Sequence, residues 1–310
     1  MRPRALPAPR ALLAGLLTGL VALALAGCEG AAGPPAEASD DASAPRVVAL
    51  GGAVAETVYA LGAEGLLVAR DASAVYPPAV LGKPSVGYFR QLGAEGVLST
   101  APTLVLADPE AGPPAVLDQI EAAGVGVVRL PGGATPADAA AQIRAVAAAL
   151  GREAAGEALV DTLEAQLAEA AALVARAEAA SGAASGRRPR VLFVLGQGGG
   201  TVSLSGAGTQ ADAFVRLSGG ENAFGAVEGY KPMTPEALVE AAPDVVFMLG
   251  RTAEAVGGPE AFARQPALAA TPAARDGRVV VLPDHALNFG PGLGAHVLAF
   301  ARTLYPDAAR

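Results

Sequence analysis

One passage of this chain occurs twice, once in each half. Its first copy, residues 87–106, reads GYFRQLGAEGVLSTAPTLVL, and its second copy, residues 229–248, reads GYKPMTPEALVEAAPDVVFM. Each copy contains a tyrosine, a nearby cation, a glutamate at the matching position and an apolar run typical of a buried strand. A unit that recurs in both halves predicts two similar lobes, and two facing lobes form a cleft in which a ligand can bind.

The first 45 residues are predicted to be a leader and a tether. Three arginines precede an apolar run, residues 11–27, which ends Leu-Ala-Gly-Cys, the pattern of a lipobox. We interpret residues 1–27 as a lipoprotein signal peptide, and Cys28, the only cysteine of the sequence, as the acylated residue that anchors an extracytoplasmic protein to a membrane. A transmembrane anchor fits less well, because the run is short and ends in small residues. Residues 28–45 are small, polar and proline-bearing, as in a flexible tether.

The charge balance argues against two kinds of partner. The sequence carries 22 basic and 30 acidic residues, a formal net charge of −8, and some of the basic residues lie in the predicted leader. Nucleic-acid binding relies on basic residues that neutralise phosphates, so we expect no nucleic-acid partner. A basic helix lying on the membrane surface is disfavoured for the same reason, which leaves the lipid as the expected anchor.

Short apolar segments alternate with helical segments along the rest of the chain. Strands are predicted at 46–52, 66–69, 104–107, 125–130, 191–195, 245–249 and 279–282. This alternation predicts an α/β protein with two Rossmann-like lobes, each built on an open parallel sheet. An alanine- and glutamate-rich run, 152–180, predicts one long helix that joins the lobes as a strut, since no heptad pattern of a coiled coil persists. The predicted division is an N-terminal lobe at 46–135, a helical connector at 136–186 and a C-terminal lobe at 187–310.

Tyr88 lies in a loop rich in proline and glycine, two residues before Arg90. One interpretation is an exposed tyrosine that packs its ring; the other is an oxygen ligand for ferric iron, because tyrosine is a known proximal ligand of haem iron. A trivalent metal and a neighbouring guanidinium both favour the phenolate. Arg90 could pair with that phenolate or with a ligand carboxylate. Tyr230, next to Lys231, occupies the equivalent place in the second copy, where it either closes on the ligand or packs at a lobe edge.

Glu95 and Glu236 begin the short predicted helix of each copy. An acid at this position is stabilised by the helix macrodipole, which explains either residue alone. The symmetric placement of the pair favours a second role, because two such acids could dock onto two arginine pockets of a dimeric partner.

Three further features carry weaker signals. The run GQGGGT, 196–201, follows a predicted strand, but no lysine follows it as in a nucleotide-binding loop, so we interpret it as a strand end open to a flat ligand. His296 lies inside a predicted helix and is interpreted as structural, whereas His285 follows the last predicted strand and is a candidate ligand. Two histidines cannot form a histidine-rich zinc site, and no catalytic motif stands out, so we predict a binding protein without enzymatic activity.

These motifs resemble those of one known family, the haem (hemin)-binding lipoproteins of bacterial ABC importers, among the class III substrate-binding proteins. The resemblance covers roughly residues 46–305 and rests on RVVALGGAVAETVYALG, VARDASAVYPPAV, SVGYFRQLGAEGVLS, VLFVLGQGGG and EGYKPMTPEALVEAAPDVV. It implies two α/β lobes joined by one long helix, with haem held between them as the transported ligand and not as a catalytic cofactor. It also implies delivery of hemin to a permease dimer in the membrane, and we expect the receptor to be a monomer.

The resemblance assigns roles to individual residues. The tyrosine of its GYxR motif, here Tyr88, is implied as the axial iron ligand, with Arg90 beside it. Glu95 and Glu236 are implied as the contacts with the permease. The whole predicted haem-binding set is Tyr88, Arg90, Tyr230, Gln197 and His285.

Two positions depart from the family pattern. Some relatives carry a histidine in the strand-end motif where this chain has Gln197, and a relative with an arginine after FGP would have it where this chain has Gly292. The second axial ligand and the anchors of the haem propionates therefore stay open. A ferric siderophore or cobalamin receptor of the same architecture is an alternative. A metallocluster enzyme subunit is compatible with the fold, but the sole cysteine in the lipobox counts against it.

Overall fold

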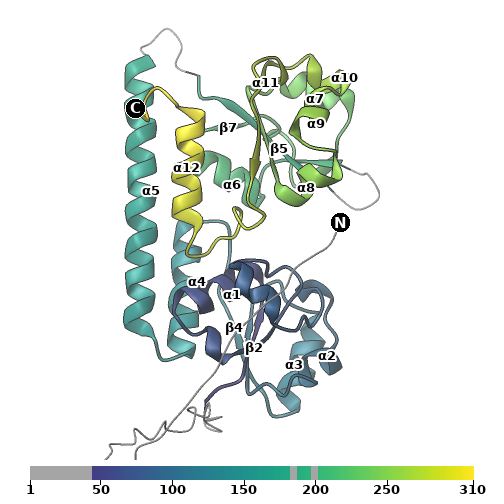
Figure 1. Ribbon diagram of the computed structural model, residues 1–310, viewed down its shortest axis with the longest axis vertical. Helices are drawn as coiled ribbons and strands as arrows, with labels where there is room; N and C mark the ends of the chain where they lie inside the picture. The colour runs from purple at the N-terminus through teal and green to yellow at the C-terminus, as the bar shows by residue number, and fades with distance from the viewer. Residues whose placement is uncertain (1–43, 182–186, 197–201) are drawn as a thin grey trace, which may run out of the picture. The chain divides into compact units, whose positions relative to one another are not determined.

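The computed structural model describes residues 44–181, 187–196 and 202–310, which form two α/β lobes (Figure 1). The predicted signal peptide, Cys28 and Gln197 lie outside the described residues. The first lobe contains a four-stranded sheet and the second a six-stranded sheet. The predicted α/β class is therefore confirmed, whereas the exact limits of the lobes stay a prediction. Within the described ranges, no helix combines the length and apolar character needed to cross a membrane.

All strands of the first sheet are parallel, in the order β2-β1-β3-β4. They are β1 (Val47–Leu50), β2 (Leu67–Arg70), β3 (Leu104–Ala107) and β4 (Gly126–Arg129). Along β1, Val47 and Ala49 face one apolar core, and the other two residues face a second core, since successive side chains of a strand point to opposite faces. Both faces of β1 are buried, which explains why the strand is apolar throughout. The helical elements of this lobe are α1 (Gly52–Ala60), η1 (Glu64–Leu66), η2 (Pro78–Gly82), η3 (Phe89–Gln91), α2 (Ala94–Leu98) and α3 (Pro114–Ala122).

The second sheet is mixed, so the prediction of a parallel sheet is wrong for part of this lobe. Its strand order is β10-β9-β5-β6-β8, with β7 paired to β5. The strands are β5 (Arg190–Gly196), β6 (Val202–Ser205), β7 (Glu221–Asn222), β8 (Tyr230–Pro232), β9 (Val245–Leu249) and β10 (Val279–Leu282). The pairs β5–β6 and β6–β8 are antiparallel. The physical reason is chain length, because the connection between β5 and β6 is far too short for the crossover that a parallel pair needs.

Helices surround the parallel part of this sheet. They are α6 (Gln210–Leu217), α7 (Pro235–Ala241), α8 (Gly250–Ala255), α9 (Pro259–Ala263), α10 (Pro266–Ala269), α11 (Pro272–Arg275) and α12 (Leu293–Leu304). Phe247 of β9 contacts Phe193 of β5 and Phe300 of α12, with ring centroids 4.8 and 5.0 Å apart. The large rings of a chain with few aromatic residues are therefore concentrated where this sheet meets α12.

The repeated passage folds alike in both lobes after its opening residues. In each copy a short helix, α2 or α7, precedes a parallel strand, β3 or β9. Ala101 and Ala242, which align in the two copies, have φ angles of 48° and 37° and each precedes a proline. Among the residues that the structure describes, they are the non-glycine residues with positive φ. The openings differ, because the first copy enters the 3₁₀ turn η3 whereas Tyr230 starts β8.

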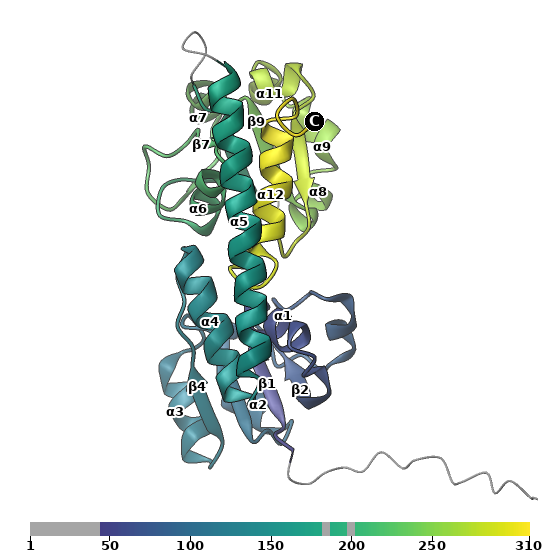
Figure 2. The ribbon, with the colours of Figure 1, turned by 90° about the vertical axis from the view of Figure 1, so that its left-hand side faces the viewer.

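Two helices connect the lobes, and the second is the long helix that the sequence predicts. Helix α4 (Pro136–Ala149) starts with a capping box in which the side chains of Thr135 and Asp138 each bond the other's backbone N–H. Helix α5 (Glu153–Ser181) has 29 residues and packs against α4 and α12 (Figure 2). Glycines permit these close approaches: a Cβ at Gly156 would lie 2.5 Å from Ala147 of α4.

One buried carboxylate bonds the first lobe to the segment that leads into α12. Glu56 of α1 accepts hydrogen bonds from the Asn288 side-chain amide at 3.1 Å and from the Gly292 backbone N–H at 2.9 Å. Burial raises the pKa of Glu56, and these two bonds act in the opposite direction. The contact ties α1 to a part of the chain more than two hundred residues away.

A substitution at the contact of α12 with α5 tests this packing. A Cβ at Gly294 would lie 2.8 Å from the Leu163 carbonyl oxygen, and a backbone atom cannot turn aside. We expect Gly294→Ala to lower the unfolding free energy by about 1–3 kcal/mol, measured by urea denaturation, despite the better helix propensity of alanine. Gly65→Ala is the matched control, because a Cβ there meets nothing within 4 Å. Equal stability of the two variants would contradict the tight α5–α12 contact.

Candidate ligand-binding site

A cavity of about 510 Å³ lies between the two lobes, at the carboxyl ends of their parallel strands. Asp108 follows β3, Gly196 ends β5 and Asp284 follows β10, and all three line the cavity. In open α/β sheets this edge is where ligands bind, because the strand-to-helix loops diverge there. The other lining residues are Gly52, Ala53, Ala72, Ser73, Tyr88, Phe89, Arg90, Glu110, Leu195, Gln210, Leu249, Arg251, Thr252, Leu287, Asn288 and Phe289.

Tyr88 and Arg90 line this cavity from the first lobe and contact each other. The Arg90 guanidinium donates from Nη1 to the Tyr88 hydroxyl oxygen at 2.6 Å and also pairs with Glu110. Burial alone would lower the pKa of Arg90, but its bonds to Glu110 and Tyr88 raise it overall, so this side chain stays a cation. Tyr88 is 39% exposed, and its oxygen accepts a bond from a cation and keeps a lone pair for a further partner.

The loop that carries Tyr88 is held by its backbone and by one buried ring. The carbonyl oxygen of Gly87 accepts the Ala72 N–H at 2.7 Å, and that of Phe89 accepts the Gly112 N–H at 2.8 Å. The Phe89 side chain is buried, and the Arg90 guanidinium lies over its ring at 4.7 Å. The tyrosine oxygen therefore enters the cavity from a fixed turn, which favours a directional contact with a ligand atom.

Tyr230 belongs to the second lobe, and the positive charge of Arg90 affects the pKa of its hydroxyl. Its partial burial raises its pKa, while hydrogen bonds with Ser205 and Thr209 and the positive charge of Arg90 act to lower it. Arg90 of one lobe and Tyr230 of the other are thus close enough to interact electrostatically. Tyr230 does not line the cavity itself, so the structure places it beside the cavity and not within its wall.

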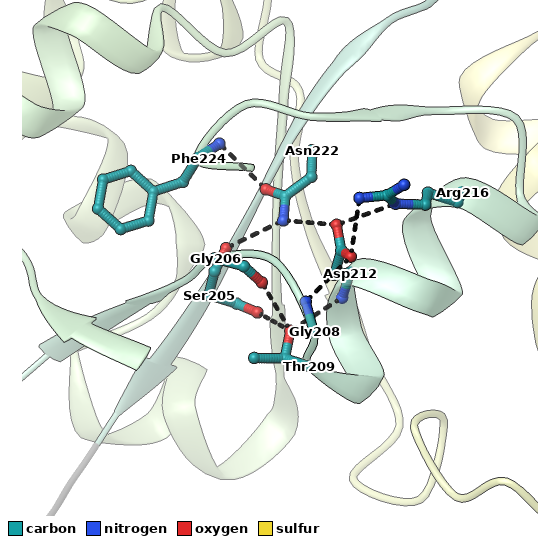
Figure 3. A network of polar contacts seen from close by, with 8 residues as sticks. All are labelled: Ser205, Gly206, Gly208, Thr209, Asp212, Arg216, Asn222 and Phe224. Carbon is teal, nitrogen blue, oxygen red and sulfur yellow. Dashed lines mark hydrogen bonds and ion pairs between the residues drawn. The ribbon is translucent and has the colours of Figure 1, made fainter. Parts of the chain in front are cut away.

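A polar network holds the neighbours of Tyr230 in place (Figure 3). The hydroxyls of Ser205 and Thr209 are 2.5 Å apart, and the Thr209 oxygen accepts the Asp212 N–H at 3.1 Å, which caps α6. Asp212, although buried, accepts from the Asn222 amide at 2.9 Å and pairs with Arg216 at 3.1 Å. β6, α6 and β7 are therefore joined at one point, close to the strand that begins with Tyr230.

His285 lies next to the cavity but its ring is occupied by aromatic contacts. It stacks on Tyr76 of the first lobe, with ring centroids 3.7 Å apart and an interplanar angle of 9°. Its edge contacts His296 of α12, with centroids 4.9 Å apart. Burial lowers the pKa of His285, against the raising effect of Asp284. Burial and the neighbouring His285 lower the pKa of His296 to about 4, so that both rings are neutral at pH 7.

The two predicted docking acids lie on corresponding helices of the two lobes. Glu95 is in the first turn of α2 and Glu236 in the first turn of α7, and both are exposed. Figure 1 shows α2 and α7 on the side of the lobes away from α5. Each acid is thus accessible to a partner that would contact both lobes at once.

The structure brings into the cavity several residues that the sequence reasoning missed. Asp108, Glu110 and Asn288 line it, and so does Arg251, which follows β9 by two residues. These four residues share one feature that the sequence could have indicated: each lies just after a strand or in the segment that follows one. In the part of the chain that the structure describes, no group of three or more His, Cys, Asp or Glu side chains could hold a metal ion.

Two α/β lobes that are joined by a long helix and enclose a cavity between them define a substrate-binding protein of class III. A model of the periplasmic binding protein family matches residues 47–286, and the chain belongs to this family. A comparison with curated proteins gave no match.

Several solved structures that are similar to this chain are heme-binding proteins. The apo form of the periplasmic heme-binding protein RhuT from Roseiflexus sp. RS-1 shares 37% identity over 86% of this chain and 100% of that one, with a TM-score of 0.78. The periplasmic heme-binding protein BhuT in complex with two hemes shares 42% identity over 86% and 99%, with a TM-score of 0.77. A periplasmic heme-binding protein from Pseudomonas aeruginosa shares 35% identity over 85% and 93%, with a TM-score of 0.76. All three of these relatives are described as periplasmic heme-binding proteins.

The neutral His296 of α12 predicts a pH dependence of stability. The unfolded chain binds a proton at His296 below about pH 6.5, whereas the folded protein resists protonation until about pH 4. Protonation therefore favours unfolding between these values, and stability falls as the pH drops through this window. We expect His296→Gln to reduce the loss of unfolding free energy between pH 7 and pH 5 by about 1–2 kcal/mol, measured by urea denaturation at both pH values. An unchanged pH dependence would contradict a buried neutral His296.

Proposed function

We propose that this protein is an extracytoplasmic receptor that binds hemin in the cavity between its lobes and delivers it to the permease of a membrane ABC importer. The observation that carries the proposal is the Tyr88 oxygen, which faces the cavity and accepts a bond from Arg90. The similarity along nearly the whole chain to periplasmic heme-binding proteins supports it. The receptor is tethered to the membrane by acylation of Cys28.

Tyr88 is the proposed ligand of the ferric iron. A phenolate is a hard, anionic oxygen donor that suits a trivalent iron, and the Arg90 guanidinium at 2.6 Å stabilises negative charge on that oxygen. The apolar lining residues Leu195, Leu249 and Leu287 give the porphyrin face a dry surface to contact. Reduction to ferrous iron should weaken the bond, because ferrous iron prefers softer ligands.

The structure supports the other three predicted haem contacts less directly than it supports Tyr88. Tyr230 lies on the second lobe, and the charge of Arg90 acts on its pKa. This position suits a residue that contacts the ligand from the side opposite to Tyr88. His285 would have to leave its stack on Tyr76 before it could reach a ligand in the cavity. Gln197 lies outside the described residues, and its contact with the ligand stays a prediction.

Substitution of Tyr88 tests the iron ligand. In a titration of the purified protein with hemin, we expect Tyr88→Phe to bind at least tenfold more weakly and to shift the visible absorption of the complex, because the iron loses its anionic ligand. Tyr59→Phe is the matched control and should keep the wild-type spectrum, because Tyr59 belongs to α1 and does not line the cavity. A wild-type spectrum and affinity in Tyr88→Phe would overturn the assignment. Displacement of hemin by a ferric siderophore or by cobalamin at equal concentration would favour the alternative receptors.

The docking role of the two exposed acids is tested by uptake. We expect Glu95→Ala combined with Glu236→Ala to abolish transport of hemin by cells or proteoliposomes that contain the permease, while hemin binding stays at the wild-type level. Glu64→Ala combined with Glu260→Ala is the control, since these acids are also exposed and lie one on each lobe. Loss of hemin binding in the first double variant, or equal loss of uptake in both, would contradict the docking role.

A further inference from the structure

The cavity contains two basic side chains among its described lining residues, and they differ in how they are engaged. These are Arg90 of the first lobe and Arg251 of the second. The acidic lining residues are Asp108, Glu110 and Asp284. A ligand that carries carboxylates needs a cation whose donors are free, so the question is which arginine can offer them.

The Arg90 guanidinium already has two partners within the protein. One of its terminal nitrogens donates to the Tyr88 oxygen at 2.6 Å, and the other pairs with Glu110. Two of its five N–H donors are thus engaged, and a ligand carboxylate would compete with Tyr88 and Glu110 for this guanidinium. Arg90 therefore supports Tyr88 and is a poor first choice for the recognition of a ligand carboxylate.

Arg251 is positioned by its backbone, and its guanidinium donates no hydrogen bond to another described residue. Its backbone N–H donates to Asp284 Oδ1 at 2.9 Å, and its Nε forms an ion pair with the same oxygen at 3.7 Å, a separation too long for a hydrogen bond. The next residue, Thr252, accepts the N–H of Gly196 through Oγ1 at 3.0 Å, which fixes the start of α8 against β5. The Arg251 side chain is 65% exposed and forms no side-chain hydrogen bond within the described residues.

Position 292, where a relative could carry an arginine, cannot supply the cation here. A Cβ at Gly292 would lie 2.6 Å from Glu56 Oε1, the oxygen that accepts the Gly292 N–H at 2.9 Å. A side chain at this position would therefore require the Glu56 carboxylate to shift, which disturbs its bond to the segment before α12.

We propose that Arg251 recognises a carboxylate of the ligand, from the lobe opposite to Tyr88. For hemin, the ligand of the proposed function on which this inference rests, the carboxylate is one of the two propionates. A guanidinium can hold a carboxylate through two parallel N–H···O bonds, and Asp284 keeps the arginine at the cavity by its bond to the backbone. The iron end of the ligand is then bound by one lobe and a propionate by the other.

The test compares hemin with hemin dimethyl ester, in which both carboxylates are esterified, in the same detergent-containing buffer. We expect Arg251→Gln to weaken the binding of hemin at least tenfold, since it removes charged hydrogen bonds, and to change the binding of the diester less than twofold. Arg251→Lys should recover part of the affinity for hemin. Arg264→Gln is the matched control, because Arg264 is an exposed arginine of the same lobe that does not line the cavity.

The possible outcomes separate the two proposals. Wild-type affinity for hemin in Arg251→Gln would overturn the role of Arg251 and leave the proposed function intact. An equal loss of affinity for hemin and for the diester would also overturn it, because the effect would then not pass through a carboxylate. A wild-type protein that binds neither compound would overturn the proposed function itself.

Discussion

The geometry of the cavity depends on the buried carboxylate of Glu56. It belongs to the first lobe, yet its two hydrogen-bond partners lie in the segment that joins β10 to α12 of the second lobe. A buried carboxylate that loses its partners is costly, so these bonds hold the two cavity walls at a defined spacing. The stack of Tyr76 on His285 forms a second contact between the lobes nearby. The two lobes are thus connected by polar and aromatic contacts between residues far apart in the sequence.

The two copies of the repeated passage share a frame and differ in chemistry. Both place a helix before a parallel strand and bend the chain through an alanine in the left-handed region, at Ala101 and Ala242. The first residues of the two copies have different structural roles. In the first copy the tyrosine pairs with an arginine at the cavity, and in the second it starts an edge strand that is antiparallel to β6. A common scaffold therefore presents one tyrosine to the ligand and leaves the other beside it.

Local patterns made the α/β class, the long helix and most strands predictable. Runs such as VVAL at β1 are apolar because both of their faces are buried, and this signal needs no tertiary information. The antiparallel strands β6 and β8 escaped prediction because VSLS and YKP are short and only partly apolar. Tyr88 could be singled out from its motif, but the roles of Glu56 and Arg251 could not. Asn288 becomes a neighbour of Glu56 only when the two lobes pack together, and Asp284 becomes a neighbour of Arg251 only when β9 and β10 pair in the second sheet.

The single continuous helix α5 gives the proposed receptor a mechanical property. Each lobe carries one exposed acid for the proposed docking and one proposed anchor for the ligand: Tyr88 on the first lobe and Arg251 on the second. Bound hemin would then act as a cross-link between two stiff bodies. A partner that grips both acids and draws the lobes apart would pull on the iron bond and the propionate bond together. Release of hemin would need no signal inside the cavity. An increase in the distance between the two lobes, imposed at their outer surface, would be enough to break the bonds at Tyr88 and at Arg251.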